Sequence, residues 1–205
     1  MAYFFRVLTP KSDPIGVGPI WRRLMTDGRR AVLSHSAELK TFDQLIVTHP
    51  DGAPICRVER NRVDDEGLGR IEIGEFLEEI RDAKPASAAD WLTRYLARVK
   101  TIYAIETLEG VSAGDGWGVV NSVREGILGA AGGITQADFQ GFSNEQGFHI
   151  LWQFLDEVSG EWNMAVLADD GGWRTFRMDR GDQTQREAFQ RGEVPEAARP
   201  IEQAP

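Results

Sequence analysis

Several short runs of the chain alternate apolar and polar residues, and a period of two predicts β-strands. These runs are rich in aromatic and β-branched residues, which suit a pleated, half-buried surface. A Pro-Asp-Gly turn divides one of them and predicts a hairpin, because these residues preset φ or tolerate a positive φ. The strands and hairpins predicted in this way span 3–9, 44–60, 70–73, 102–108, 148–168 and 173–178.

Other segments repeat their apolar residues every three or four positions, and this period predicts helices. The clearest one begins at Ser87, a residue type that caps helices, and carries Trp91, Tyr95 and Val99 at helical spacing. In another, we expect Gly126 to allow close helix packing. The predicted helices span 19–33, 74–83, 88–99, 118–130 and 183–191, and residues 132–147 are predicted to form a loop.

The order of these elements repeats along the chain, with an offset of about 100 residues. Each half reads strand, helix, hairpin, short strand, helix, which is close to the ferredoxin-like plan. The pattern predicts an α+β fold of two tandem ferredoxin-like β-α-β-β-β-α repeats, with antiparallel or mixed sheets and helices on one face. The predicted parts are a first repeat at 1–87, a connecting helix at 88–100, a second repeat at 101–192 and a loose C-terminal tail at 193–205.

The charge is unevenly distributed between the two halves of this acidic protein. The formal net charge is −9, and residues 1–100 hold 16 Lys and Arg against 15 Asp and Glu, while residues 101–205 hold 7 against 17. An acidic surface repels phosphate backbones and gains nothing from counterion release. We therefore expect no nucleic acid partner. A basic protein partner fits the charge, and so does a solvated acidic surface that keeps the chain soluble.

The single cysteine and the lack of long apolar stretches bear on the compartment. Cys56 is the only cysteine and lies in a predicted strand, so it excludes an intrachain disulfide and predicts a buried thiol. No apolar stretch approaches the length needed to span a membrane, and the N-terminus lacks the basic region and cleavage site of a signal peptide. We expect a cytoplasmic protein of bacterial type with no membrane partner.

No motif along the chain completes a catalytic, cofactor or metal site. The glycine-rich turn at 110–118 lacks the spacing of a nucleotide-binding loop, and Asp115 within it would repel phosphate. The three histidines are too far apart for zinc-ligand spacing. Ser143 lacks the following glycine of a nucleophile elbow, which favours a turn-capping role. We expect no catalytic residues, no metal site and no cofactor.

The stretch GFSNEQGFHILWQF at 141–154 packs aromatic and polar residues together. Strand alternation sends Phe148 and Trp152 to a core face and His149 and Gln153 to the opposite face. In the partner strand, Asn163 also falls opposite the core. Polar groups beside an apolar surface suit a ligand or a partner, and satisfied polar groups between the repeats are the alternative.

These observations favour a binding or protein-interaction protein with no chemistry of its own. The partner is a protein or a small molecule, and the oligomeric state stays open. The candidate ligand-binding residues are His149, Gln153, Asn163 and Trp117. The alternative is a small enzyme or small-molecule sensor with a pocket near His149 and Trp152. An enzyme would show a deep pocket with a carboxylate in reach of His149, whereas an interaction module would show an open surface with exposed aromatics.

Overall fold

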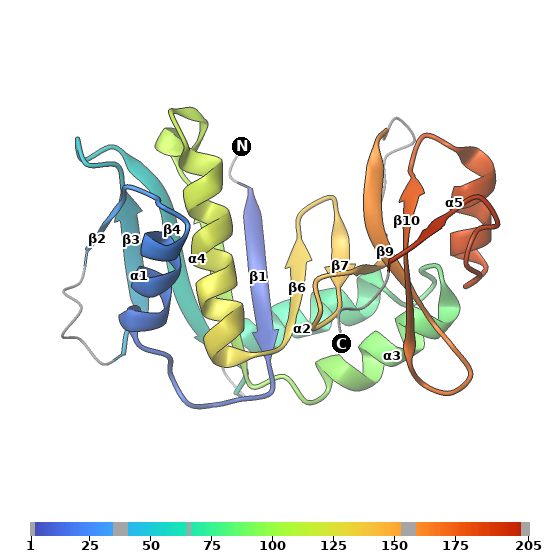
Figure 1. Ribbon diagram of the computed structural model, residues 1–205. Coiled ribbons are helices and arrows are strands. Elements are labelled where there is room, and N and C mark those ends of the chain that lie inside the picture. The colour runs from blue at the N-terminus through green and yellow to red at the C-terminus, as the bar shows by residue number, and fades with distance from the viewer. Residues whose placement is uncertain (1–2, 35–40, 65–66, 153–158, 202–205) are drawn as a thin grey trace. The chain divides into compact units, whose positions relative to one another are not determined.

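The computed structural model describes residues 3–34, 41–64, 67–152 and 159–201 and has an α+β fold (Figure 1). These residues form five α-helices, a short 3-10 helix and eleven strands that pair mostly antiparallel. The chain divides into two compact units, and each unit consists of two chain segments. The first unit holds residues 1–72 and 99–138, and the second holds residues 73–98 and 139–205.

The first unit contains an antiparallel sheet in the order β6-β1-β5-β4-β3-β2. Strands β1 and β5 pair along almost their whole length, with Val7 opposite Tyr103. The bounds are β1 Phe4–Thr9, α1 Val17–Thr26, β2 Val32–Leu33, β3 Gln44–Thr48, β4 Pro54–Arg62, β5 Thr101–Thr107, the 3-10 helix Glu109–Ser112, α4 Gly116–Ala131 and β6 Ile134–Ala137.

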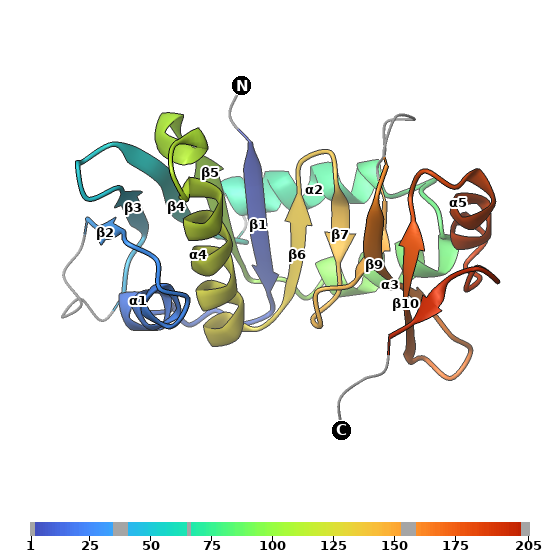
Figure 2. The same ribbon diagram turned by 45° about the horizontal axis from the view of Figure 1, so that its top comes forward.

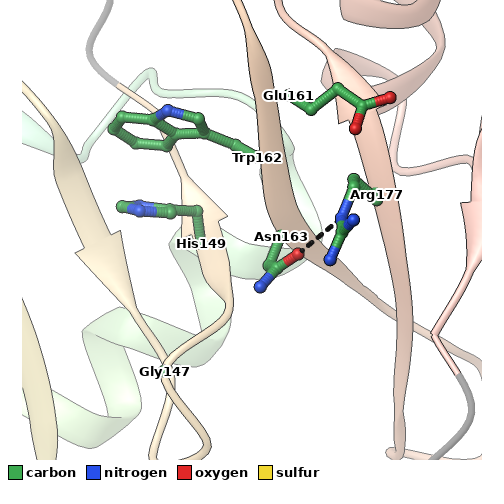
Figure 3. Close-up of a pocket in the computed structure, with 6 residues that line it drawn as sticks. All are labelled: Gly147, His149, Glu161, Trp162, Asn163 and Arg177. Carbon is green, nitrogen blue, oxygen red and sulfur yellow. Dashed lines mark hydrogen bonds between the residues drawn. The ribbon is translucent and has the colours of Figure 1, made fainter.

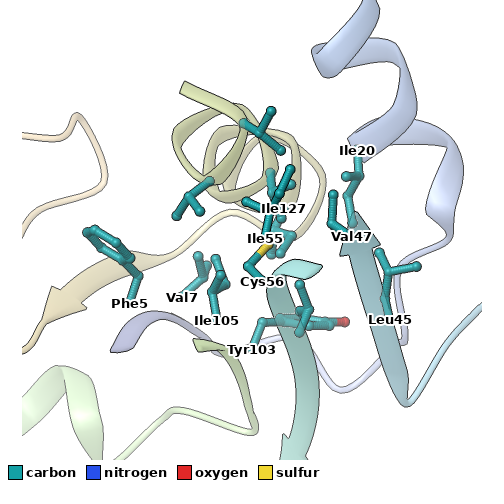
Figure 4. Close-up of a cluster of buried hydrophobic side chains, with 14 of the residues drawn as sticks. Phe5, Val7, Ile20, Leu45, Val47, Ile55, Cys56, Tyr103, Ile105 and Ile127 are labelled. Carbon is teal, nitrogen blue, oxygen red and sulfur yellow. The ribbon is translucent and has the colours of Figure 1, made fainter. Parts of the chain in front are cut away.

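Helices α1 and α4 lie side by side on one face of this sheet (Figure 2). Their apolar stripes, spaced three or four residues apart, meet alternate residues of the strands in one aliphatic core (Figure 4). Gly126 lets the helices approach closely, because a Cβ there would stand 2.8 Å from Ile20 Cα. The expected role of Gly126 in helix packing is thus confirmed. Fully buried members of this core include Val7, Ile20, Val47, Val58, Tyr103, Ile105, Val123 and Ile127.

The second unit contains strands in the order β11-β10-β9-β8-β7. Its core includes Met164, Val166, Phe176, Met178 and Phe189, which come from β9, β10 and α5. The bounds are α3 Ala86–Leu96, β7 Gly141–Ser143, β8 His149–Leu151, β9 Glu161–Leu167, β10 Trp173–Asp179, α5 Gln183–Gln190 and β11 Arg199–Pro200. Helix α2, Leu68–Glu79, contains the boundary between the units.

No tandem ferredoxin-like repeat is identified in the described residues. The strands at 3–9 and 102–108, which were expected to open two separate copies, instead pair with each other in the first unit, where Phe5 lies opposite Ile105. Both strands have the same alternating pattern, so the pattern alone cannot tell equivalent strands of two repeats from neighbours in one sheet. The α+β class is confirmed, and the pairing of these two strands gives no support to the duplication.

Four local predictions are corrected by the structure. Residues 70–73 lie in helix α2, because Ile73, Phe76 and Ile80 form a buried helical stripe there while Ile71 is exposed. The expected loop at 132–147 contains strands β6 and β7. The expected hairpin at 148–168 is absent, because β8 pairs with β9 in parallel. Pro85, not Ser87, stands at the N-cap of α3.

Several other elements match the sequence patterns. The hairpin at 44–60 forms from β3 and β4, and the helices predicted at 88–99, 118–130 and 183–191 form within a few residues of the expected bounds. Cys56 is fully buried, and burial raises the pKa of its thiol to about 12. The C-terminal tail is more ordered than expected, because residues 199–200 add strand β11 to the edge of β10.

Candidate functional site

Strands β9 and β10 place polar side chains opposite the core of the second unit. Met164 and Phe176 are fully buried, so the alternation of a strand turns Asn163 and Arg177 toward solvent. These two residues are direct partners in the antiparallel register. Arg177 Nε donates a hydrogen bond to Asn163 Oδ1 at 3.2 Å, which fixes the orientation of both side chains.

A tight turn before β8 sets the position of His149. Asn144 is 1% exposed, and its Oδ1 accepts hydrogen bonds from the backbone N–H groups of Gln146 (3.1 Å) and Phe148 (3.0 Å). Gly147 has a φ of 83°, a conformation that side-chain-bearing residues rarely adopt. The turn therefore leads directly into the strand at His149, and the nearby Gly147 adds no side chain to the pocket.

The His149 ring is held by one hydrogen bond and one ring contact. Its Nδ1 lies 3.2 Å from Ser143 Oγ, and its centroid lies 4.1 Å from that of Trp162, with 32° between the planes. The guanidinium carbon of Arg180 lies 3.6 Å from the centroid of the Trp162 ring. Burial lowers the pKa of Arg180, yet an arginine there stays charged and favours the electron-rich ring.

These side chains surround an open pocket of about 400 Å³ in the second unit (Figure 3). Arg177, Asn163 and Glu161 are solvent-exposed, while His149 and Trp162 are half-buried. Glu161 forms an ion pair with Arg199 at 3.3 Å. Among the described residues, the terminal nitrogens of Arg177 form no hydrogen bond or ion pair, so they are available to a ligand. The pocket is lined by Gly147, His149, Glu161, Trp162, Asn163 and Arg177.

The candidate residues from the sequence separate into two places. His149 and Asn163 both line the pocket. Gln153 lies outside the described residues. Trp117 belongs to the first unit, where it contacts Tyr3 and Phe5. The prediction that these four residues form one site stays untested for Gln153, and the pocket in the second unit does not include Trp117.

Sequence reasoning missed the arginine of the pocket. Arg177 lies in a strand where alternation alone predicts an outward side chain, but only the pairing register places it opposite Asn163. Trp162 shares a strand face with Met164, packs against the core residues of this unit and also lines the pocket. A large amphipathic ring at the end of a strand serves both purposes, because only part of it needs burial.

The described residues contain no metal cluster and no membrane-spanning helix. No group of three or more His, Cys, Asp or Glu side chains in that part of the chain is arranged to hold a metal ion. No helix there is long and apolar enough to cross a bilayer. Comparisons of the chain with protein-family models, with curated proteins and with solved structures give no match.

Proposed function

We propose that this protein is a non-catalytic interaction protein that binds an acidic segment of a partner protein in the pocket of the second unit. The observation that carries the proposal is Arg177. Its guanidinium is exposed and oriented through Nε by Asn163, and its terminal nitrogens remain available. A guanidinium held in this way offers a carboxylate two parallel hydrogen bonds.

The surroundings of Arg177 support a protein segment as the ligand. The pocket is open on the exposed strands β9 and β10, so a carboxylate on an extended chain could enter without a conformational change. Trp162 contributes a half-buried aromatic side chain to the same pocket, and aromatic residues together with arginine carry much of the energy of protein interfaces. The net charge of −9 opposes an acidic partner only over long distances, and salt screens that repulsion.

The position of the Glu161 carboxylate in the pocket favours a binding role over a catalytic one. An acid or base next to His149 would need a carboxylate in hydrogen-bond reach. Glu161 instead forms an ion pair with Arg199. The pocket is also open to solvent, whereas reaction sites exclude water to strengthen electrostatic effects.

A peptide titration tests the proposal. We expect an N-acetylated, C-amidated triglutamate peptide to shift the NMR signals of Trp162 and Asn163, and the matching triglutamine peptide to leave them unchanged. Arg177→Gln should weaken the binding of triglutamate at least about tenfold, because a charge-assisted bidentate contact is lost. Arg174→Gln is the matched control, since Arg174 lies on the same strand but pairs with Asp170.

Three outcomes would count against the proposal. Triglutamate could fail to bind, triglutamine could bind equally well, or Arg177→Gln could retain the wild-type affinity. Each would show that Arg177 is not a carboxylate receptor. An equal loss in Arg174→Gln would show that general surface charge, and not this pocket, attracts the peptide.

One contact favours a second candidate function, hydrolysis through an acyl-enzyme. Ser143 Oγ lies 3.2 Å from His149 Nδ1, which is the spacing of a serine nucleophile and its general base. Ser143 is only 7% exposed, so a substrate would need to displace part of the turn around it. Labelling of Ser143 by a fluorophosphonate, abolished in His149→Gln, would establish this alternative, and unlabelled protein would remove it.

A further inference from the structure

A cluster of aromatic side chains and one arginine lies in the first unit, between the start of β1 and helix α4. The Tyr3 ring lies 4.9 Å from that of Phe5, and Trp117 meets both rings edge-on at 6.2 and 6.4 Å. The guanidinium carbon of Arg124 lies 5.5 Å from the centroid of Phe5. Trp117 is 46% exposed, so the cluster reaches the surface.

Arg124 is a half-buried cation that lacks a counter-ion. Among the described residues it has no ion pair and no hydrogen bond, and burial lowers its pKa. The acidic groups nearby are engaged elsewhere. Glu125 pairs with Arg23, and Asp138 pairs with Arg6 at 2.6 Å. Glu125 favours the charged form of Arg124 through its own charge, but among the described residues the Arg124 guanidinium has no direct ion pair or hydrogen bond.

Tyr3 supplies a second polar group without a partner. Its hydroxyl oxygen is buried and makes no hydrogen bond with any described group. Burial, with a smaller contribution from Asp138, raises the pKa of Tyr3 to about 12, so the hydroxyl keeps its proton near neutral pH and can donate a hydrogen bond. A buried donor without an acceptor lowers stability, and a half-buried cation without a direct partner adds to that cost, unless a ligand supplies the acceptor.

We propose that Arg124, Tyr3 and Trp117 form a binding site for a small organic acid, separate from the pocket at Arg177. The carboxylate accepts hydrogen bonds from the Arg124 guanidinium and the Tyr3 hydroxyl. The aromatic or apolar body of the acid packs against the exposed part of Trp117. One cation without a direct partner and one neutral donor match a single negative charge, which favours a monocarboxylate over a phosphate ester.

Calorimetric titration with phenylacetate tests this site in the full-length protein. We expect saturable binding of phenylacetate and none of phenylacetamide, which has the same body without the charge. Arg124→Gln should reduce the affinity at least about tenfold, and Tyr3→Phe should reduce it several-fold while leaving the rings in place. Arg22→Gln is the control, because Arg22 is an exposed arginine of α1 in the same unit.

A thermal measurement gives a second readout that does not depend on the affinity. Arg124→Gln should raise the melting temperature of the ligand-free protein, because it removes a half-buried charge that has no direct ion pair or hydrogen bond. Phenylacetate should raise the melting temperature of the wild type and leave that of Arg124→Gln unchanged.

Two results would overturn the inference. One is the absence of phenylacetate binding to the wild type, and the other is unchanged affinity in Arg124→Gln. The outcome is distinguishable from that of the peptide experiment, because Arg177→Gln should leave phenylacetate binding intact and Arg124→Gln should leave triglutamate binding intact.

Discussion

The outward sheet faces of the two units carry arginines of opposite character. In the first unit, Arg6 pairs with Glu72 and Asp138, and Arg57 pairs with Glu106, so these cations are neutralised by side chains of the same unit. In the second unit, Arg199 pairs with Glu161, but its register partner Arg177 bonds, among the described residues, only to a neutral amide through one nitrogen. The difference indicates that the first face serves the fold and the second face is suited to a partner.

The hydrophobic cores of the two units also differ, in the residues that form and border them. In the first unit, helices α1 and α4 cover one face of the sheet and bury a mainly aliphatic core. In the second unit, the core around Phe176 and Phe189 is bordered by half-buried tryptophans, including Trp162 of the pocket. Trp162 both packs against this core and lines the pocket, so the pocket lies where the core of the second unit meets solvent.

The largest expected effect is a cavity in the first core. Ile127 of α4 is fully buried, so Ile127→Ala should lower the free energy of unfolding by about 2–5 kcal/mol, because neighbours fill such a cavity only partly. Urea denaturation measures the change. Ile71→Ala is the matched control, since Ile71 is a helical isoleucine that is 61% exposed, and a similar loss in both variants would contradict the assigned core.

A smaller effect is expected from the turn that shapes the pocket. Asn144→Ala removes the side-chain acceptor of two backbone N–H groups, and the free energy of unfolding should fall by about 1–3 kcal/mol. The same variant should weaken triglutamate binding, because His149 follows this turn directly. Stability equal to the wild type would show that water replaces the Asn144 oxygen and that the turn does not depend on it.

The two kinds of arginine should respond differently to loss of charge. Arg57→Gln breaks the ion pair with Glu106 and should lower the free energy of unfolding by up to about 1 kcal/mol, since the pair is only partly shielded from solvent. Arg177→Gln should change it by less than about 0.5 kcal/mol. Parallel denaturation curves measure both, and the reverse order would invert the roles given to the two faces.

The smallest effect is a pH dependence at α5. Asp182 Oδ1 accepts hydrogen bonds from the N–H groups of Thr184 and Gln185, and the bonds from Gln185 lower the pKa of Asp182. A carboxyl whose pKa is lowered by folding contributes stability above its unfolded pKa, and that contribution disappears as the pH falls through the folded value. Asp182→Asn keeps the cap acceptor and should flatten the acid limb of the stability curve below about pH 4. An unchanged limb would assign the acid sensitivity to other carboxyls.

Local sequence patterns correctly predicted the elements that depend on residues close together in the chain. The hairpin at 44–60 and helix α4 followed from a turn and a period. Pairings between distant strands did not follow, because β1 and β5 meet across about 95 intervening residues, a separation that no local pattern encodes. The parallel pairing of β8 with β9 escaped prediction for a different reason, since strand periodicity is identical in parallel and antiparallel pairs.

The candidate site was predictable to a similar extent. Alternation identified Asn163 as outward-facing and placed His149 near it. Arg177 could be assigned to the site only after the β9–β10 register was known, because its partner lies 14 residues away on another strand. Arg124 and Tyr3 come from elements 121 residues apart, and nothing in either local sequence marks them as neighbours.

Nitrogen-15 NMR of the arginine side chains tests the contrast between the two faces most directly. The account predicts slow guanidinium rotation for Arg6 and Arg57, whose terminal nitrogens are bound, and fast rotation for Arg177 until triglutamate peptide is added, when it slows. Slow rotation of Arg177 in the free protein, or fast rotation that persists with saturating peptide, would contradict the claim that this arginine is held ready for a carboxylate.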